Sequence, residues 1–184
     1  WVFLFLVPAV TMRMIADEKK SGTMELLLTR PISDLQIVVS KYLASLILVL
    51  LALIPTLIYF FSVYHLGNPT GNIDVAGTVG SYLGLFFLAA IYAAIGIFAS
   101  SLTSNQIISF IIALLVAFFF YLGFDMLSGM WIFSGIDTFI ADLGINAHYR
   151  SMSRGVIDTR DIVYFISVIL VFIFLTKTII QNRN

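Results

Sequence analysis

Hydrophobic residues in this chain gather in long blocks that are separated by short polar connections. The four longest blocks run from Tyr42 to Tyr64, Val79 to Leu102, Ile107 to Leu127 and Ile162 to Ile180. The first three contain no Lys or Arg, and the fourth contains only Lys177. Because an α-helix of about 20 residues crosses the hydrocarbon core of a bilayer, this pattern predicts four transmembrane helices.

A fifth apolar stretch, Trp1–Met12, stands at the beginning of the sequence. Residue 1 is not Met, so we expect this stretch to continue a helix that begins further upstream. From Gly129 to Arg160, apolar residues are interrupted by acids and glycines, which predicts one or two short external helices rather than a span. The sequence thus indicates an all-α polytopic membrane protein with five visible transmembrane helices, the first truncated, in a single domain over residues 1–184.

The positive charges of the connections predict the orientation of the spans. The first connection and the C-terminal tail hold most of the cations, namely Arg13, Lys19, Lys20, Arg30, Lys41, Lys177 and Arg183. We expect both segments, and therefore the C-terminus, on the cytoplasmic side. The connection 65–78 contains no Lys or Arg and is expected outside.

Turn and cap residues predict where several helices begin and end. Gly22 is expected to end the first helix, and Thr23 to cap a short helix over Met24–Thr29. Two capping-box signatures precede long spans, namely Ser33 with Gln36 and Thr103 with Gln106.

Composition narrows the classes of function. The chain is 60% hydrophobic and 11% charged, and its ten Lys and Arg balance its ten Asp and Glu, so it lacks the basic field that holds nucleic acid. It has no cysteine and only two histidines, which argues against a metal centre. No glycine is followed by lysine, so the phosphate-binding loop of nucleotide hydrolases is absent and we expect no cofactor in this chain.

Few side chains in the spans could carry chemistry. Asp125 lies near the end of a span, where it is either a proton or cation site or an acid that water solvates. We expect the second, and we expect His65 and His148 to be ordinary solvated side chains. The spans contain no set of residues typical of an intramembrane enzyme.

Two features indicate contacts. Small residues recur along the span that begins at Val79 and predict a face for close helix packing, either within the subunit or against a partner: Gly80, Gly84, Ala89 and Ala93. The connection from Arg13 to Lys41 combines charges of both signs with Leu26 to Leu28. On its residues alone, it is either an interfacial anchor or a docking element for a cytoplasmic partner.

The same connection carries a resemblance to a known family. The runs PAVTMR (8–13) and ADEKKSGTMELLLTRP (16–31), followed by Lys41, resemble the signature of type 2 ABC exporter permeases, the ABC-2 family. Within it, LGNPTGNID (66–74), IGIFASSLTSNQI (95–107) and SRGVIDTRDIVYF (153–165) are most similar to the gliding motility-associated permease subunits of Bacteroidota. Members of the family have six spans, so the resemblance implies that the first is missing from this sequence.

The resemblance implies a division of labour between subunits. A separate ATP-binding subunit would hold ATP and Mg, and its closure would move a coupling helix in the first cytoplasmic loop. That helix and its flank map onto Glu18, Lys19, Lys20, Gly22, Thr23, Glu25, Leu26, Arg30 and Pro31. A second contact maps onto the short turn formed by Thr103, Ser104, Asn105 and Gln106.

The resemblance also implies a second permease or an auxiliary membrane subunit, in a homodimer or a heterodimer. The expected function is export across the bacterial inner membrane, in gliding motility or an associated secretion process. The alternative is a structural membrane anchor of a motility or secretion complex that transports nothing. No charge pattern in the spans selects a substrate.

Overall fold

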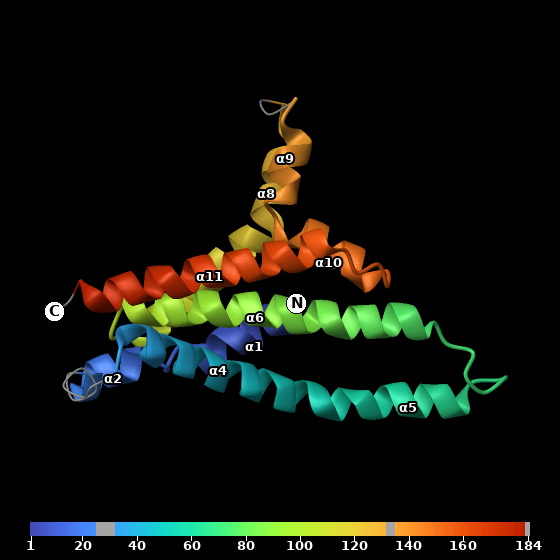
Figure 1. Cartoon of the computed structure of the whole chain (residues 1–184), viewed down its shortest axis with the longest axis horizontal. Helices are drawn as coiled ribbons and strands as arrows, with labels where there is room; N and C mark the ends of the chain where they lie inside the picture. Colours follow the sequence, from blue (N-terminus) through green and yellow to red (C-terminus); the bar gives the residue numbers. More distant parts are fainter. Residues whose placement is uncertain (25–31, 132–134, 183–184) are drawn as a thin grey trace.

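The computed structural model describes residues 1–24, 32–131 and 135–182, and this part of the chain forms helices connected by turns and loops (Figure 1). Four helical segments are long and apolar enough to cross a membrane among these residues. They are Asp34–Leu66, Val75–Leu102, Gln106–Ser128 and Thr159–Gln181. Each contains one of the predicted blocks, so the prediction of four membrane-spanning helices is confirmed.

Two of these segments are interrupted. The first consists of α4 (Asp34–Leu53), the 3₁₀ turn η1 (Ile54–Thr56) and α5 (Leu57–Leu66). The third consists of α7 (Gln106–Phe118), the π-helical turn η2 (Phe119–Gly123) and α8 (Phe124–Ser128). The other two are the single helices α6 (Val75–Leu102) and α11 (Thr159–Gln181).

Shorter helices precede and connect the spans. The apolar start of the chain forms α1 (Val2–Thr11), and α2 (Ala16–Ser21) follows it. Between the last two spans, α9 (Asp137–Asp142) and α10 (Ile145–Ser153) confirm the prediction of short helices before the final span. In Figure 1, α8 and α9 point upward, away from the bundle, whose long axis is horizontal.

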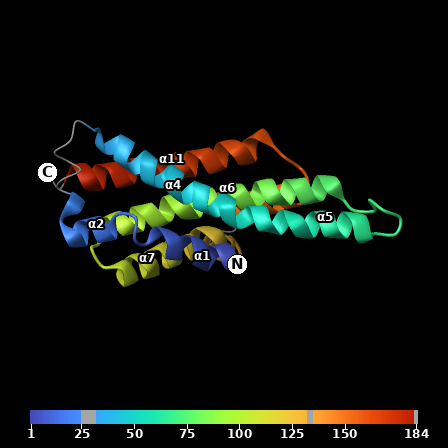
Figure 2. The ribbon, with the colours of Figure 1, turned by 90° about the horizontal axis from the view of Figure 1, so that it is seen from below.

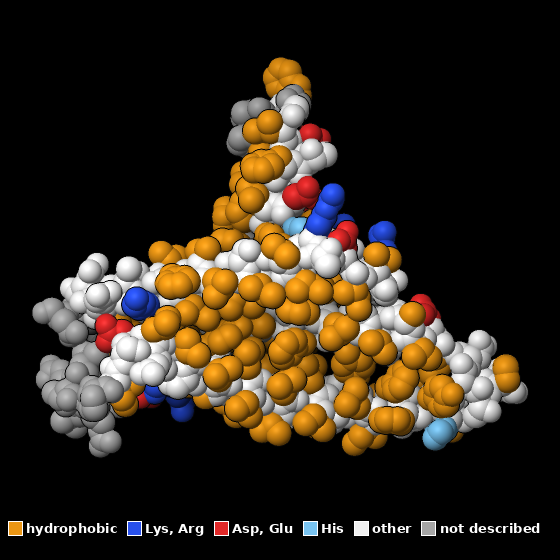
Figure 3. Space-filling model, in the orientation of Figure 1, with side chains coloured by type: hydrophobic (Ala, Val, Ile, Leu, Met, Phe, Trp, Pro, Cys, Tyr) orange, Lys and Arg blue, Asp and Glu red, His pale blue; other side chains and the backbone are white. Residues whose placement is uncertain are grey.

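Helix α6 is the centre of the bundle, and α1, α4, α7, α10 and α11 pack around it (Figures 1 and 2). The residues in the middle of α6, among them Ile91, Tyr92 and Ile95, are buried on every side of the helix. The alanines and the glycine between them are small, so neighbouring helices can approach closely. The face of the bundle shown in Figure 3 is covered with hydrophobic side chains, and the charged side chains on this face lie near its ends and around α9 and α10. This distribution suits helices that are surrounded by lipid.

The small residues of α6 make close contacts within the subunit. A Cβ at Gly80 would lie 2.5 Å from the Met152 carbonyl oxygen and 2.7 Å from the Cα of Gly155. A Cβ at Gly96 would lie 1.9 Å from Oγ1 of Thr11. The absence of a side chain at Gly80 therefore lets the end of α10 pack directly against α6, and its absence at Gly96 lets α1 do the same.

The predicted start at Ser33 is confirmed, the predicted end at Gly22 is confirmed in part, and the predicted start at Thr103 is wrong. Ser33 forms the predicted capping box with Gln36. Gly22 ends a helix with a left-handed φ of 72°, but that helix is α2, because the first helix, α1, already ends at Thr11. The predicted box of Thr103 with Gln106 does not form, because Asn105 is the N-cap of α7 and accepts from the Ile107 amide at 2.9 Å. The side chain of Gln106 therefore takes no part in capping α7 and is available to another partner.

Candidate functional site

Helix α2 lies at one end of the bundle, beside the turn that connects α6 to α7 (Figure 2). The residues that the sequence singles out in two separate connections, 18–23 and 103–106, are therefore neighbours in space. Four of the predicted coupling residues, and most of the predicted helix Met24–Thr29, lie outside the described residues: Glu25, Leu26, Arg30 and Pro31.

A single serine fixes the start of α2 to the end of α6. The Ser100 hydroxyl accepts from the backbone amides of Ile15 at 3.0 Å and Ala16 at 2.9 Å, and donates to the Met12 carbonyl at 3.0 Å. A hydroxyl has one proton to donate and two lone pairs, so these three bonds use the full hydrogen-bonding capacity of the Ser100 hydroxyl. Sequence reasoning did not assign it this role, because a serine in a run of small residues reads as a packing residue.

Three side-chain interactions connect α2 to neighbouring spans. The Lys19 ammonium donates to the Ser101 carbonyl at the end of α6, and the Gln106 amide at the start of α7 donates to the Asp17 carboxylate. Lys41 of α4 forms an ion pair with Glu18. Helix α2 is thus bound through side chains to three spans, and we call these interactions, with those of Ser100, the α2 clamp.

The remaining predicted residues surround the clamp. Lys20 is exposed, and with Gln106 it lines two adjoining polar hollows. Ser104 and Asn105 line one of them, and Asp17, Glu18 and Ser21 line the other. Thr23 lies at the far end of α2, where its hydroxyl is 2.8 Å from that of Ser21. This end of the molecule therefore presents a polar, charged surface.

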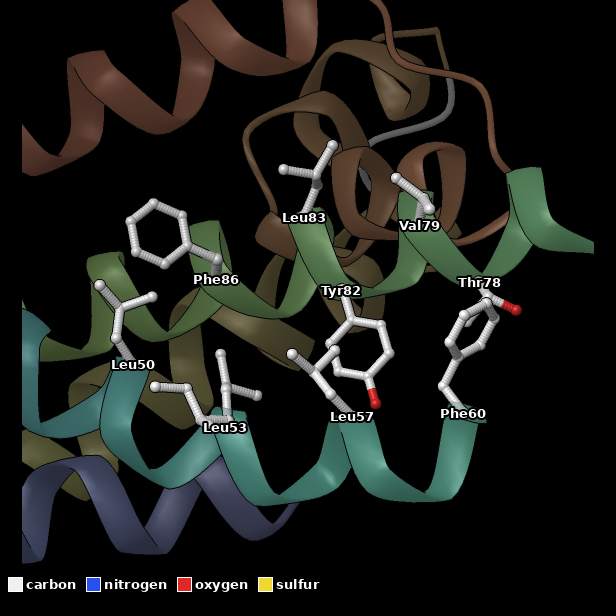
Figure 4. A pocket seen from close by; sticks show the side chains of 10 residues that line it. Leu50, Leu53, Leu57, Phe60, Thr78, Val79, Tyr82, Leu83 and Phe86 are labelled. Carbon is white, nitrogen blue, oxygen red and sulfur yellow. The ribbon is translucent and has the colours of Figure 1, made fainter. Parts of the chain in front are cut away.

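A third hollow lies between α4–α5 and α6 and has a volume of about 500 Å³ (Figure 4). Pro55 interrupts the first span next to it, and the Tyr82 hydroxyl donates to the Thr56 carbonyl at 2.9 Å. The lining is otherwise apolar apart from Thr78: Leu50, Leu53, Ile54, Leu57, Phe60, Val79, Leu83 and Phe86. The lining residues hold no charge that would select an ionic ligand.

The other polar residues of interest lie away from α2. Asp125 accepts a hydrogen bond from the buried Asn146, and His65 is exposed as expected. The expectation for His148 is wrong, because its Nδ1 lies 2.7 Å from Oδ1 of the buried Asp161. Among the described residues, no group of three or more His, Asp and Glu side chains could hold a metal ion.

The long apolar helices define a multi-pass membrane protein. The sequence profile of the ABC-2 family transporter proteins matches residues 3–178, and the chain belongs to this family of membrane permeases. Permeases of this family generally work with an ABC ATPase subunit. No curated protein and no solved structure matches the chain. The match supports the family but not the gliding motility group within it.

Proposed function

We propose that this chain is the permease subunit that couples ATP hydrolysis in a separate ABC subunit to export across the bacterial inner membrane. The observation that carries the proposal is the α2 clamp, which binds α2 to α4, α6 and α7. The contact surface would comprise α2, the segment 22–31 that follows it, and the turn 103–106.

The clamp provides a route for movement from this surface into the bundle. Ser100 joins the backbone at the start of α2 directly to α6, the helix on which the other spans pack. A displacement of α2 by the ATP-binding subunit would therefore shift α6 rather than bend an isolated loop. ATP and Mg would be bound by the partner, and a second permease or auxiliary membrane subunit would complete the transport path.

Gliding motility or an associated secretion process is the proposed setting, and it is supported by the resemblance of residues 66–74, 95–107 and 153–165. A structural membrane anchor remains the rival function. In reconstituted vesicles, ATP hydrolysis that depends on transported material would support the permease, whereas intact assembly with unresponsive hydrolysis would support the anchor.

The orientation that the proposal requires is testable by cysteine labelling, since the chain has no native cysteine. Cysteine replacing the exposed Ser21 or Asn182 is expected to be shielded from a membrane-impermeant maleimide in intact cells. Cysteine replacing the exposed Asn72 or Thr138 is expected to react fully. Reaction at Ser21 in intact cells, at the level seen for Asn72, would contradict the orientation.

A further inference from the structure

Helices α8 and α9 leave the bundle together and take no part in the proposed function. In Figure 1 they point across the direction in which α6 and α11 run. They pack mainly along each other, and neither contains a buried residue. Because the long helices cross the bilayer lengthwise, α8 and α9 extend along the plane of the membrane. We call residues 124–131 and 135–143 the α8–α9 projection.

The length of the third span sets the depth at which the projection begins. Helix α7 has 13 residues and η2 has 5. At a rise of about 1.5 Å per residue, they extend about 27 Å together. The hydrocarbon core of a bilayer is about 30 Å thick. A chain that enters this core at Gln106 has therefore nearly crossed it at Gly123, and α8 starts close to the surface opposite α2.

The last span gives the same depth for the end of α9. The Tyr164 hydroxyl, in the second turn of α11, donates to the Leu143 carbonyl directly after α9, at 2.7 Å. His148 has one ring nitrogen 2.9 Å from the Asp142 carbonyl oxygen and the other 2.7 Å from Asp161 in the first turn of α11. In α11 the apolar run starts directly after Asp161. The end of α9 is therefore level with the place where the last span enters the hydrocarbon.

The side chains on and beside α9 divide into an apolar side and a polar side. Ile136, Phe139 and Leu143 follow one another at intervals of three and four residues and are 54%, 66% and 41% exposed. Such intervals place side chains on one side of an α-helix. Asp137 and Thr138, which are also exposed, fall on the other side. Helix α9 is therefore amphipathic, and its subunit leaves the apolar side largely uncovered.

The two sides of the projection face in different directions. In the view of Figure 3, its hydrophobic side chains gather toward the end of the bundle that carries α2, and its acidic side chains lie on the opposite side. Because the projection lies near the surface opposite α2, the first side faces hydrocarbon and the second faces water. Met126 and Trp131 add 69% and 89% exposed apolar side chains. Tryptophan is typical of the boundary between hydrocarbon and headgroups.

We propose that the α8–α9 projection binds phospholipid and lies in the surface of the leaflet opposite α2. Its apolar side is immersed among the acyl chains, and its acids remain among the headgroups and water, as in other amphipathic helices that lie in a membrane surface. A water-soluble partner would approach from the outside and meet the acidic side. Lipid is therefore the occupant that the direction of the apolar side favours.

Two neighbouring residues of α9 test the proposal, because they report on opposite sides of one helix. Spin labels are attached to Phe139→Cys and Thr138→Cys in the full chain, which has no native cysteine in this sequence, and each protein is reconstituted in phosphatidylcholine vesicles. Power saturation measures the access of oxygen, which concentrates among acyl chains, and of a water-soluble nickel chelate. We expect the label at 139 to be open to oxygen and shielded from nickel, and the label at 138 to show the reverse.

Two further labels calibrate the scale. Asn72→Cys lies in the exposed connection between α5 and α6, and Val171→Cys replaces a side chain that is 55% exposed in the middle of α11. We expect position 139 to resemble Val171 and position 138 to resemble Asn72. Equal access of nickel at 138 and 139 would overturn the proposal, because α9 would then lie in water. Shielding of 139 from both reagents would also overturn it, because protein would then cover this side. If Phe139→Cys does not accumulate, Ile136→Cys reports on the same side, and no outcome depends on an ATP-binding subunit.

Discussion

Replacing Gly96 with alanine is expected to destabilise the subunit by roughly 1–3 kcal/mol, the usual cost of overpacking a core. The added Cβ would lie 1.9 Å from Oγ1 and 2.8 Å from Cβ of Thr11, so α1 would have to move away from α6. The Thr11 hydroxyl is held by the Val7 carbonyl at 2.9 Å and cannot turn aside without losing that bond. Gly96→Leu is expected to abolish accumulation of folded protein. Thermal unfolding in detergent measures the first effect, and membrane yield the second.

Gly84→Ala is the matched control for Gly96→Ala on the same helix. The three atoms nearest to its Cβ would be side-chain atoms of Met152 and Tyr149, at 3.3 to 3.4 Å, so we expect a smaller loss of stability. Gly96→Ala is also expected to be less costly when Thr11 is replaced by alanine, because Oγ1 is then absent. Equal unfolding temperatures for wild type and Gly96→Ala would show that α1 does not pack on α6 at this position.

Reversing one charge of the Glu18–Lys41 pair is expected to uncouple the permease while leaving it folded. The side chains are only 22% and 23% exposed, so water screens the pair in part, and the stability cost of Lys41→Glu is expected to lie between about 1 kcal/mol, the value for an exposed pair, and about 3 kcal/mol, the lower value for a buried one. The reversed side chain would, however, face Glu18 with a like charge and release α2 from α4. We expect ATP-driven activity to fall about tenfold, within the usual range of coupling free energies.

The double variant Glu18→Lys with Lys41→Glu separates the loss of the pair from the loss of either residue. It restores opposite charges at the contact and is expected to recover most of the activity. Arg13→Glu changes the net charge equally in the same connection, at an exposed site outside the clamp, and is expected to remain active. Full activity of both single reversals at Glu18 and Lys41 would remove this ion pair from the coupling route.

The fold followed largely from hydrophobic block length, because lipid imposes that length whatever the neighbouring helices do. The Ser33 cap was also predictable, since both of its hydrogen bonds form within four residues. The capping box at Thr103 was predicted wrongly because Asn105, two residues further on, caps α7 instead. The Gln106 side chain, which the box would need, donates to Asp17 of α2.

Long-range polar contacts were beyond the reach of the sequence. Ser100 bonds to Ile15 and Ala16, and Lys41 pairs with Glu18, across separations that no spacing rule covers. His148 was misread for the same reason, since its partners depend on how α9, α10 and α11 meet. The sequence also did not show that the two predicted coupling segments are neighbours, because their proximity depends on the packing of α2 beside the turn 103–106.

The most direct measurement of the central claim is site-specific photocross-linking in membranes of cells that contain the complete transporter. A photoreactive phenylalanine replaces the exposed Ser21, Ser104 or Asn72, and mass spectrometry identifies the adducts. The account predicts that Ser21 and Ser104 cross-link to a protein that carries the nucleotide-binding motifs of an ABC ATPase, and that Asn72 does not. Absence of that adduct from both Ser21 and Ser104, or its formation from Asn72 alone, would contradict the assignment of this end of the bundle as the coupling surface.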